Sequence, residues 1–333
     1  MPIQIDYALG APGPQFAKPQ PPPAPEQATA CLGDCMATHG LPQYVPNYLS
    51  AIHYHLNDAR IRFVEATHTY YVKWNVDDGK EYCDNISVSA LIYKYFDAFD
   101  EDAVLSKMTR SRAQSDSKYF GLSNADIKAM WKENRIKAST EGTFVHELVE
   151  REMNGFDLAG SVYSPLTRIQ QYLRWKSEHF VGDFVPYRTE MRLLSEAERL
   201  TGTIDLVYIR RDHGPPESTG NVLHVHIADW KCSRGIQMTN RYSNGTTLCS
   251  DLPNCNFWRY SLQQNAYVRM LESYSDFQFN GRNYSRIQVM SVKLVVFHET
   301  NEKALIVPID IDRCRTAAIF NDRAQDVLKS ATQ

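Results

Sequence analysis

The stretch HIADWKCSRG, residues 226–235, places a carboxylate, Asp229, two positions before a lysine, Lys231, inside an otherwise apolar run. Side chains two apart on a β-strand point to the same face, so both charges share the face of Ile227. Burying either charge is costly unless a partner compensates it. The stretch therefore predicts a buried strand on which a carboxylate and a lysine lie side by side and act at the same site.

The segment LTGTIDLVYIR, residues 200–210, repeats this design, with Asp205 on the face of Val207. A hairpin that sets Asp205 opposite Asp229 also brings Val207 to Ile227, and residues 212–222 become its loop. Two facing carboxylates repel each other by an amount on the order of a kcal/mol. A divalent cation is the simplest compensation, and the neighbouring lysine alone is the second.

Two histidines, His224 and His226, occupy the alternate positions of the strand that carries Asp229. On a regular strand they point to the opposite side of the sheet. The H-x-H pair is therefore not expected to join Asp229 in one metal site.

The whole chain has the composition of an ordinary globular protein. It has 333 residues, 43% hydrophobic and 23% charged, with a formal net charge of -3. Overall charge therefore gives no argument for nucleic-acid binding, which must rest on local clusters. No run of 18 apolar residues is present, so no membrane span is expected, and no secretory signal is visible.

Seven scattered cysteines favour a reduced, intracellular compartment. CLGDC and CSDLPNC could be two halves of a metal site, but neither has the C-x-x-C spacing typical of zinc sites.

Two regions are expected along the chain. Residues 1–48 form a Pro-rich tail without a core, which could still bind a protein partner, and residues 49–333 form one folded domain. Within that domain we expect an N-terminal extension at 49–140, a catalytic core at 141–300, and a final strand and helix at 301–333.

Hydrophobic periodicity predicts helices around a mixed central sheet. Helices are expected at 87–100, 123–155, 165–180, 256–274 and 315–330. Strands are expected at 184–195, 200–210, 221–233, 285–299 and 304–310, and a strand pair at 60–74, with turn signals at DDG.

Two helices carry polar pairs at a spacing of four, which places each pair on one helix face. His146 and Glu150 lie in EGTFVHELVEREMNG, and Gln263 and Tyr267 lie in SLQQNAYVRML. HELVE lacks the final histidine of the H-E-x-x-H zinc helix, which disfavours a zinc protease.

The order of these motifs resembles the PD-(D/E)XK nuclease superfamily. G-T-x-x-H-x-x-x-E is followed by a distant Glu190, then G-T-x-D, D-x-K and Q-x-x-x-Y. The nearest branch is that of the RecB-like and Cas4-like exonucleases, and SVSALIYKYFDAFDED is similar to a segment of nucleases from large DNA viruses. The resemblance implies an α/β, restriction-endonuclease-like core over residues 60–300.

The resemblance also implies roles for single residues. His146, Asp205 and Asp229 match metal ligands, and Lys231 matches the catalytic lysine. Glu190, Gln263 and Tyr267 complete the catalytic set, and Glu150 has a supporting position. The Asp205–Asp229 interval is longer than the family's usual one, and the four cysteines of an iron–sulfur cluster are missing, so no cluster is expected.

This ligand set suits Mg²⁺ or Mn²⁺, and the resemblance implies a phosphodiester hydrolase that uses this cation and acts on DNA. An exonuclease in DNA repair, recombination or replication is expected. An endonuclease or junction-cutting enzyme of the same fold, and an inactive nucleic-acid-binding subunit, remain alternatives. The expected location is the cytoplasm or the nucleus. A virus-encoded protein would have this location in its host cell.

A basic stretch at residues 106–138 is the candidate path for the DNA, because it holds eight Lys or Arg against three acids. A solvated helix face is the alternative. The candidate nucleic-acid contacts are Lys128, Trp131, Lys132, Arg135 and, after the D-x-K motif, Arg234.

Overall fold

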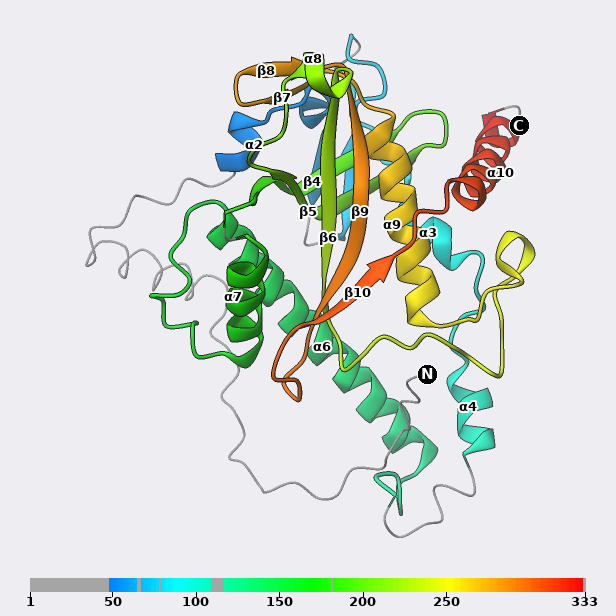
Figure 1. Ribbon diagram of the computed structural model, residues 1–333. Coiled ribbons are helices and arrows are strands. Elements are labelled where there is room, and N and C mark those ends of the chain that lie inside the picture. The colour runs from blue at the N-terminus through cyan, green and yellow to red at the C-terminus, as the bar shows by residue number, and fades with distance from the viewer. Residues whose placement is uncertain (1–47, 65–66, 78, 109–116, 181, 332–333) are drawn as a thin grey trace. The chain divides into compact units, whose positions relative to one another are not determined.

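The computed structural model describes residues 48–64, 67–77, 79–108, 117–180 and 182–331 (Figure 1). The expected Pro-rich tail, apart from Tyr48, lies outside the described residues. So do two cations of the basic stretch, Arg110 and Arg112.

Contacts within the chain define two compact units. One comprises Met1–Leu41 and Ala98–Thr140, and the other comprises Pro42–Asp97 and Glu141–Gln333. The described part of the first unit holds α4 (Glu101–Lys107) and the beginning of α6 (Asn124–Met153).

The second unit is an α/β fold around a six-stranded sheet. Its strands are β3 (Ile86–Ser87), β4 (Phe184–Ser195), β5 (Leu200–Arg210), β6 (Val222–Cys232), β9 (Arg286–Phe297) and β10 (Leu305–Ile309). Its helices are α2 (Tyr48–Ile52), η1 (Leu56–Arg60), α3 (Val88–Tyr93), α7 (Thr167–His179), α8 (Pro216–Thr219), η3 (Thr247–Cys249), α9 (Asn256–Glu272), α10 (Arg313–Ala331) and the remainder of α6.

Two short hairpins complete the fold: β1 (Ile61–Val64) with β2 (Thr69–Val72), and β7 (Phe277–Phe279) with β8 (Arg282–Tyr284). The first is the strand pair expected at 60–74. One residue of the predicted DDG turn, Asp78, lies outside the described residues, and beyond it Tyr82 bridges back to Val72.

The sheet is mixed, as predicted. Its order is β10-β9-β6-β5-β3, and β4 also pairs with β5. β3 with β5 and β6 with β9 are parallel, whereas the remaining pairs are antiparallel. The α/β class with helices around a mixed central sheet is therefore confirmed.

The β5–β6 hairpin has the predicted register, because Val207 lies opposite Ile227. The ladder extends only from Tyr208↔His226 to Leu206↔Ala228. Beyond it, β5 pairs with β3. The two central strands therefore separate just where each carries its aspartate.

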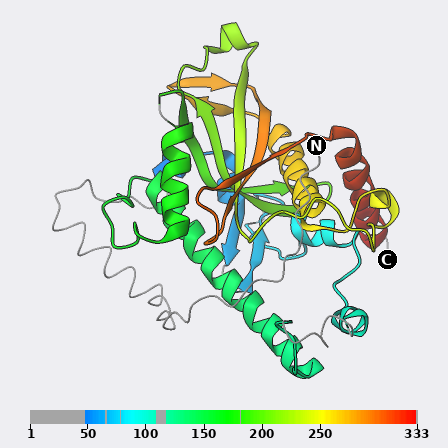
Figure 2. The same ribbon diagram turned by 60° about the horizontal axis from the view of Figure 1, so that its bottom comes forward.

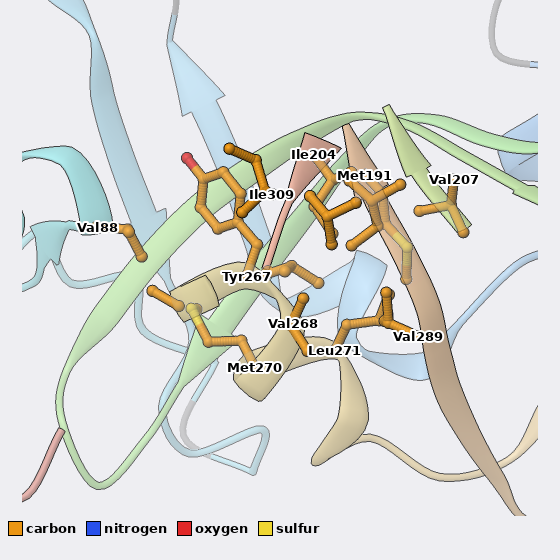
Figure 3. Close-up of a cluster of buried hydrophobic side chains, with 14 of the residues drawn as sticks. Val88, Met191, Ile204, Val207, Tyr267, Val268, Met270, Leu271, Val289 and Ile309 are labelled. Atoms are coloured by element: carbon orange, nitrogen blue, oxygen red, sulfur yellow. The ribbon is translucent and has the colours of Figure 1, made fainter. Parts of the chain in front are cut away.

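Helix α9 covers one face of the sheet. Tyr267, Val268 and Leu271 belong to a buried cluster with residues of the strands, among them Ile204 and Val207 (Figure 3). A regular strand would place Ile204 and Val207 on opposite faces. Because both enter this cluster, the alternation predicted for β5 does not hold regularly through Asp205.

Helix α7 covers the other face, and both views show the sheet between it and α9 (Figure 1 and Figure 2). Tyr172 and Trp175 of α7 pack edge-on against Trp230 of β6, with ring centroids 5.9 and 5.0 Å away. Trp230 thus points away from the face of Asp229, as the strand period predicted. Among the described residues, no helix combines the length and apolar character needed to span a membrane.

His226 provides a test of this packing through the pH dependence of stability. Burial, with repulsion from Lys293 and Arg210, lowers the pKa of His226 to about 4. Its stabilising contribution is therefore complete above pH 6.5, where the unfolded histidine is also neutral, and is lost as the pH falls toward 4.

We expect His226→Phe to reduce the loss of unfolding free energy between pH 7 and pH 4.5 by about 1–2 kcal/mol, because solvent near the partly exposed ring screens part of the full effect. The phenyl ring can keep the contacts with Tyr208 and Phe184, whose centroids lie 5.1 and 5.2 Å away. Urea unfolding at stepped pH measures this loss. An unchanged pH slope in the variant would contradict the assignment.

Candidate metal-binding active site

Asp229 is the most deeply buried acid of the predicted site, with 2% of its surface exposed. Its Oδ2 forms an ion pair with Lys231 Nζ, and its Oδ1 accepts a 2.7 Å hydrogen bond from Gln264 Nε2. Burial raises the pKa of Asp229 to about 7, Lys231 opposes this rise, and Asp205 adds to it. The acid and base of the opening motif therefore share one face, as predicted.

Asp205 lies just past the last paired residues of β5 and β6. Its Oδ2 accepts a 2.8 Å hydrogen bond from the backbone N–H of Trp230. This N–H belongs to the residue between Asp229 and Lys231. The separated strand ends are thus linked through the carboxylate of one strand and the backbone of the other.

His146 of α6 presents a free imidazole lone pair to this carboxylate. Its Nε2 lies 3.1 Å from the Trp230 carbonyl oxygen, so Nε2 carries the hydrogen and donates it. Burial lowers the pKa of His146, which favours the neutral ring. Nδ1 is then an acceptor, and it lies 3.6 Å from Asp205 Oδ2. Two acceptors that face each other form a site for a cation.

Glu190 of β4 completes this group. Thr189 pairs with Leu206 and Met191 with Ile204, so Glu190 lies across from Asp205. Its φ of +44° is a left-handed conformation that a glutamate rarely adopts. Burial raises the pKa of Glu190 well above its ordinary value, and Asp205 is the strongest of the acids that add to it.

One ligand atom each from His146, Glu190 and Asp205 lie within 4.8 Å of one another. An imidazole nitrogen with two carboxylates fits a divalent cation such as Mn²⁺ or Mg²⁺. Such a cation would relieve the repulsion that raises the pKa of Glu190. The ligands predicted from the sequence were His146, Asp205 and Asp229. The structure adds Glu190 to His146 and Asp205, and it pairs Asp229 with Lys231, so the role of Asp229 as a ligand stays a prediction.

The Q-x-x-x-Y residues of α9 contact α3 and β5. Gln263 Nε2 donates to Ser89 Oγ at 2.7 Å and to Tyr267 Oη at 3.1 Å. Gly202 of the TGTID motif accommodates the Tyr267 ring, because a Cβ on Gly202 would lie 2.4 Å from Tyr267 Cε1. The predicted pair thus ties α9 to α3 and to β5.

Gln264, the neighbour of Gln263, is the glutamine that holds a carboxylate, and the sequence interpretation missed it. The buried side of α9 spans Ser261, Leu262 and most of residues 264–271, so periodicity does not distinguish the two glutamines. The available signal was their adjacency in SLQQNAY. Glu150, expected in a supporting position, is close enough to contribute to the raised pKa of Glu190.

The predicted nucleic-acid contacts of α6 belong to the first unit. Lys128 pairs with Asp102 and Arg135 with Glu101, at 2.7 and 3.1 Å. Trp131 Nε1 donates to the hydroxyl of Tyr119 at 3.0 Å. Two of the four predicted contacts are therefore engaged by acids of α4, although exposed ion pairs of this kind are weak.

The remaining two of the five predicted contacts, Lys132 and Arg234, are exposed. Arg234 lies three residues after Lys231 and has no ion pair within the described part of the chain.

Comparisons with known proteins add little to this geometry. No family model and no curated protein matches the chain. Among solved structures, the chain is similar to a "putative exonuclease" from Eubacterium rectale, at 9% identity, over 74% of this chain and 79% of that one, with a TM-score of 0.27. At this identity and TM-score the likeness carries no argument about function.

The close approach of Tyr267 to Gly202 predicts a contrast between two glycines. Gly202→Ala would push a methyl group into a buried ring, and we expect it to lower the free energy of unfolding by about 1–3 kcal/mol. Gly142→Ala is the matched control, because its Cβ would lie 3.8 Å from Cys232 Cβ, an ordinary contact, within α6. The control should be neutral or stabilise by up to about 1 kcal/mol. Urea denaturation measures both changes in stability. Equal effects would contradict the close packing of Tyr267 against Gly202.

The donor set predicts binding of a divalent cation. Mn²⁺ or Mg²⁺ at a hundredfold excess over Kd should stabilise the folded chain by about 2.7 kcal/mol, seen as a higher Tm. Asp205→Asn should reduce this shift strongly, because it removes a negatively charged ligand. Asp212→Asn, which alters an exposed ion pair with Arg210, is the control and should keep the shift. Equal metal shifts in both variants would place the ion elsewhere.

Proposed function

We propose that the chain is a metal-dependent deoxyribonuclease that hydrolyses phosphodiester bonds, an exonuclease of the RecB-like branch of the PD-(D/E)XK superfamily. The observation that carries this proposal is the Asp229–Lys231 ion pair beside the group of His146, Glu190 and Asp205. The buried ammonium group of Lys231 next to several acids can stabilise the negative charge that develops on a phosphate during hydrolysis.

In this proposal His146, Glu190 and Asp205 hold the divalent cation, and Asp229 lies next to this group of ligands. When bound, such a cation polarises the phosphate and lowers the pKa of a coordinated water. The imidazole is kept in the required tautomer by the hydrogen bond from Nε2 to the Trp230 carbonyl.

Lys231 has a distinct role, that of a fixed positive charge. Burial by itself would lower the pKa of Lys231, but Asp229 and Asp205 outweigh it, and the net shift is upward. A lysine that stays protonated does not serve as a general base at neutral pH. It can orient the attacking water or stabilise charge on the phosphate in the transition state.

Gln264 and Asp229 hold Lys231 in place. Gln264 fixes one oxygen of Asp229, so that the other oxygen points at the lysine. The ring of Tyr260 lies on the ammonium group, with its centroid 4.9 Å from Lys231 Nζ. These contacts aim the charge before any substrate arrives, which is how preorganised sites lower a barrier.

The nuclease proposal is tested with end-labelled linear DNA and covalently closed circular DNA in the presence of Mg²⁺ or Mn²⁺. An exonuclease degrades the linear DNA and spares closed circles. Cleavage of closed circles would assign the endonuclease alternative instead. Full activity in EDTA would refute the metal-dependent mechanism.

Replacement of Lys231 separates chemistry from metal binding. We expect Lys231→Gln and Lys231→Ala to lower the rate by at least about 100-fold, because each removes a charge-stabilising group. The metal-induced Tm shift should persist, since the lysine is not a ligand. The exposed Lys303→Ala is the control and should cleave normally.

Cleavage at the parental rate by both Lys231 variants would refute the proposed mechanism. Binding of DNA without any cleavage by the parental protein would favour the inactive binding subunit.

A further inference from the structure

Helices α3 and α9 meet in two layers next to the proposed active site. The first layer is the hydrogen bond between Ser89 Oγ and Gln263 Nε2. The second is the Arg259 guanidinium over the ring of Tyr93, 5.4 Å from its centroid. Tyr93 follows Ser89 by four residues, whereas Arg259 precedes Gln263 by four. The helices are therefore antiparallel, and both layers lie on their facing sides.

Tyr93 is unusually exposed for an aromatic residue in a helix contact. Its exposed fraction is 55%, although the preceding residues Leu91 and Ile92 are buried at 2%. Arg259 is half-buried. The second layer therefore offers an aromatic ring and a planar cation to solvent.

This layer is connected to the catalytic lysine through one residue. Tyr260, next to Arg259 on α9, places its ring 4.9 Å from Lys231 Nζ. Burial raises the pKa of Tyr260, Lys231 opposes the rise, and Tyr93 and Asp229 add to it. Tyr260 thus lies within electrostatic range of both the exposed tyrosine and the ion pair of the site.

We propose that Tyr93, Arg259 and Tyr260 form a subsite that stacks an unpaired nucleobase of the strand whose phosphate reaches Lys231. This inference rests on the proposed nuclease function and adds the substrate class, a single-stranded or frayed end.

The chemistry of the three side chains supports a base as the ligand. A base presents flat π-faces that stack on a tyrosine ring or a guanidinium plane, whatever its sequence. A base can use such a surface only after it leaves the stack of a duplex. In this proposal Lys231 meets a phosphate, and the Tyr93 ring and the Arg259 guanidinium lie near it. Together they fit one nucleotide, because each base is covalently linked to the phosphates beside it.

The subsite is tested with single-stranded oligonucleotides that carry one abasic position, moved stepwise along the strand. Binding is measured by fluorescence anisotropy in the Lys231→Gln background, which keeps the strand intact, and cleavage is measured with the parental lysine. We expect loss of the base at one position near the end to weaken binding about 5- to 150-fold.

Tyr93→Ala should weaken binding of the intact strand by a similar factor and show no further loss on the abasic strand. Tyr93→Phe should restore most of the affinity, because it returns the ring. Tyr54→Ala is the control, since Tyr54 is 53% exposed and lies outside these helices. It should respond to the abasic position as the parental chain does. Thermal unfolding of each variant verifies the fold.

The outcomes distinguish the subsite from the proposed function. If cleavage requires Lys231 but the abasic scan is flat, or if Tyr93→Ala keeps the full abasic loss, the subsite is refuted and the nuclease stands. If the parental chain cleaves no DNA with either metal, the proposed function is refuted and the subsite is refuted with it. A preference for blunt duplex over single strand would also overturn the inference.

Discussion

The placement of two aspartates where β5 and β6 separate is the constraint on which the rest of the site depends. Asp205 and Asp229 each lie next to the last ladder pair, Leu206↔Ala228, and burial raises the pKa of Asp229 to about 7. Each acid therefore needs a compensating partner. Lys231 and Gln264 supply it for Asp229, and the Trp230 N–H supplies part of it for Asp205.

The helices around the sheet are arranged to meet these needs. Helix α6 brings His146, whose neutral ring faces Asp205 with a lone pair. Helix α9 brings Gln264 to one aspartate and Tyr260 to the lysine. The close approach of α9 depends on Gly202, where any larger side chain would meet the Tyr267 ring. The same helix then continues into the layer of Arg259 and Tyr93, so one element serves both the charges and the proposed base contact.

Glu190 shows how stability is sacrificed at this site. It is a poorly solvated acid near three other acids, and its backbone has a left-handed φ. Both features are unfavourable in the chain alone. A cation bound among His146, Glu190 and Asp205 would offset both costs, because its binding free energy stabilises the folded chain against the repulsion and the backbone strain.

The sequence by itself determined the elements and the pairing of the central hairpin. A period of two fixed which residues of β6 share a face, and matching of apolar positions fixed Val207 opposite Ile227. The strand period and the register are local or depend on one strand pair, so they can be read from periodicity. The choice of His146 and the two aspartates as candidate site residues came instead from the order of the motifs and its resemblance to a nuclease superfamily.

The tertiary structure decided what periodicity cannot express. Neither the positive φ of Glu190 nor the irregular course of β5 near Asp205 is visible in the sequence period, and the structure groups Glu190 with His146 and Asp205. The choice of Gln264 over Gln263 depended on how α9 is rotated against the sheet, because the buried side of that helix is too broad for the pattern to fix its orientation. The pairing of Lys128 and Arg135 with acids of α4 was likewise invisible in a count of charges, since a sequence lists cations but not their partners.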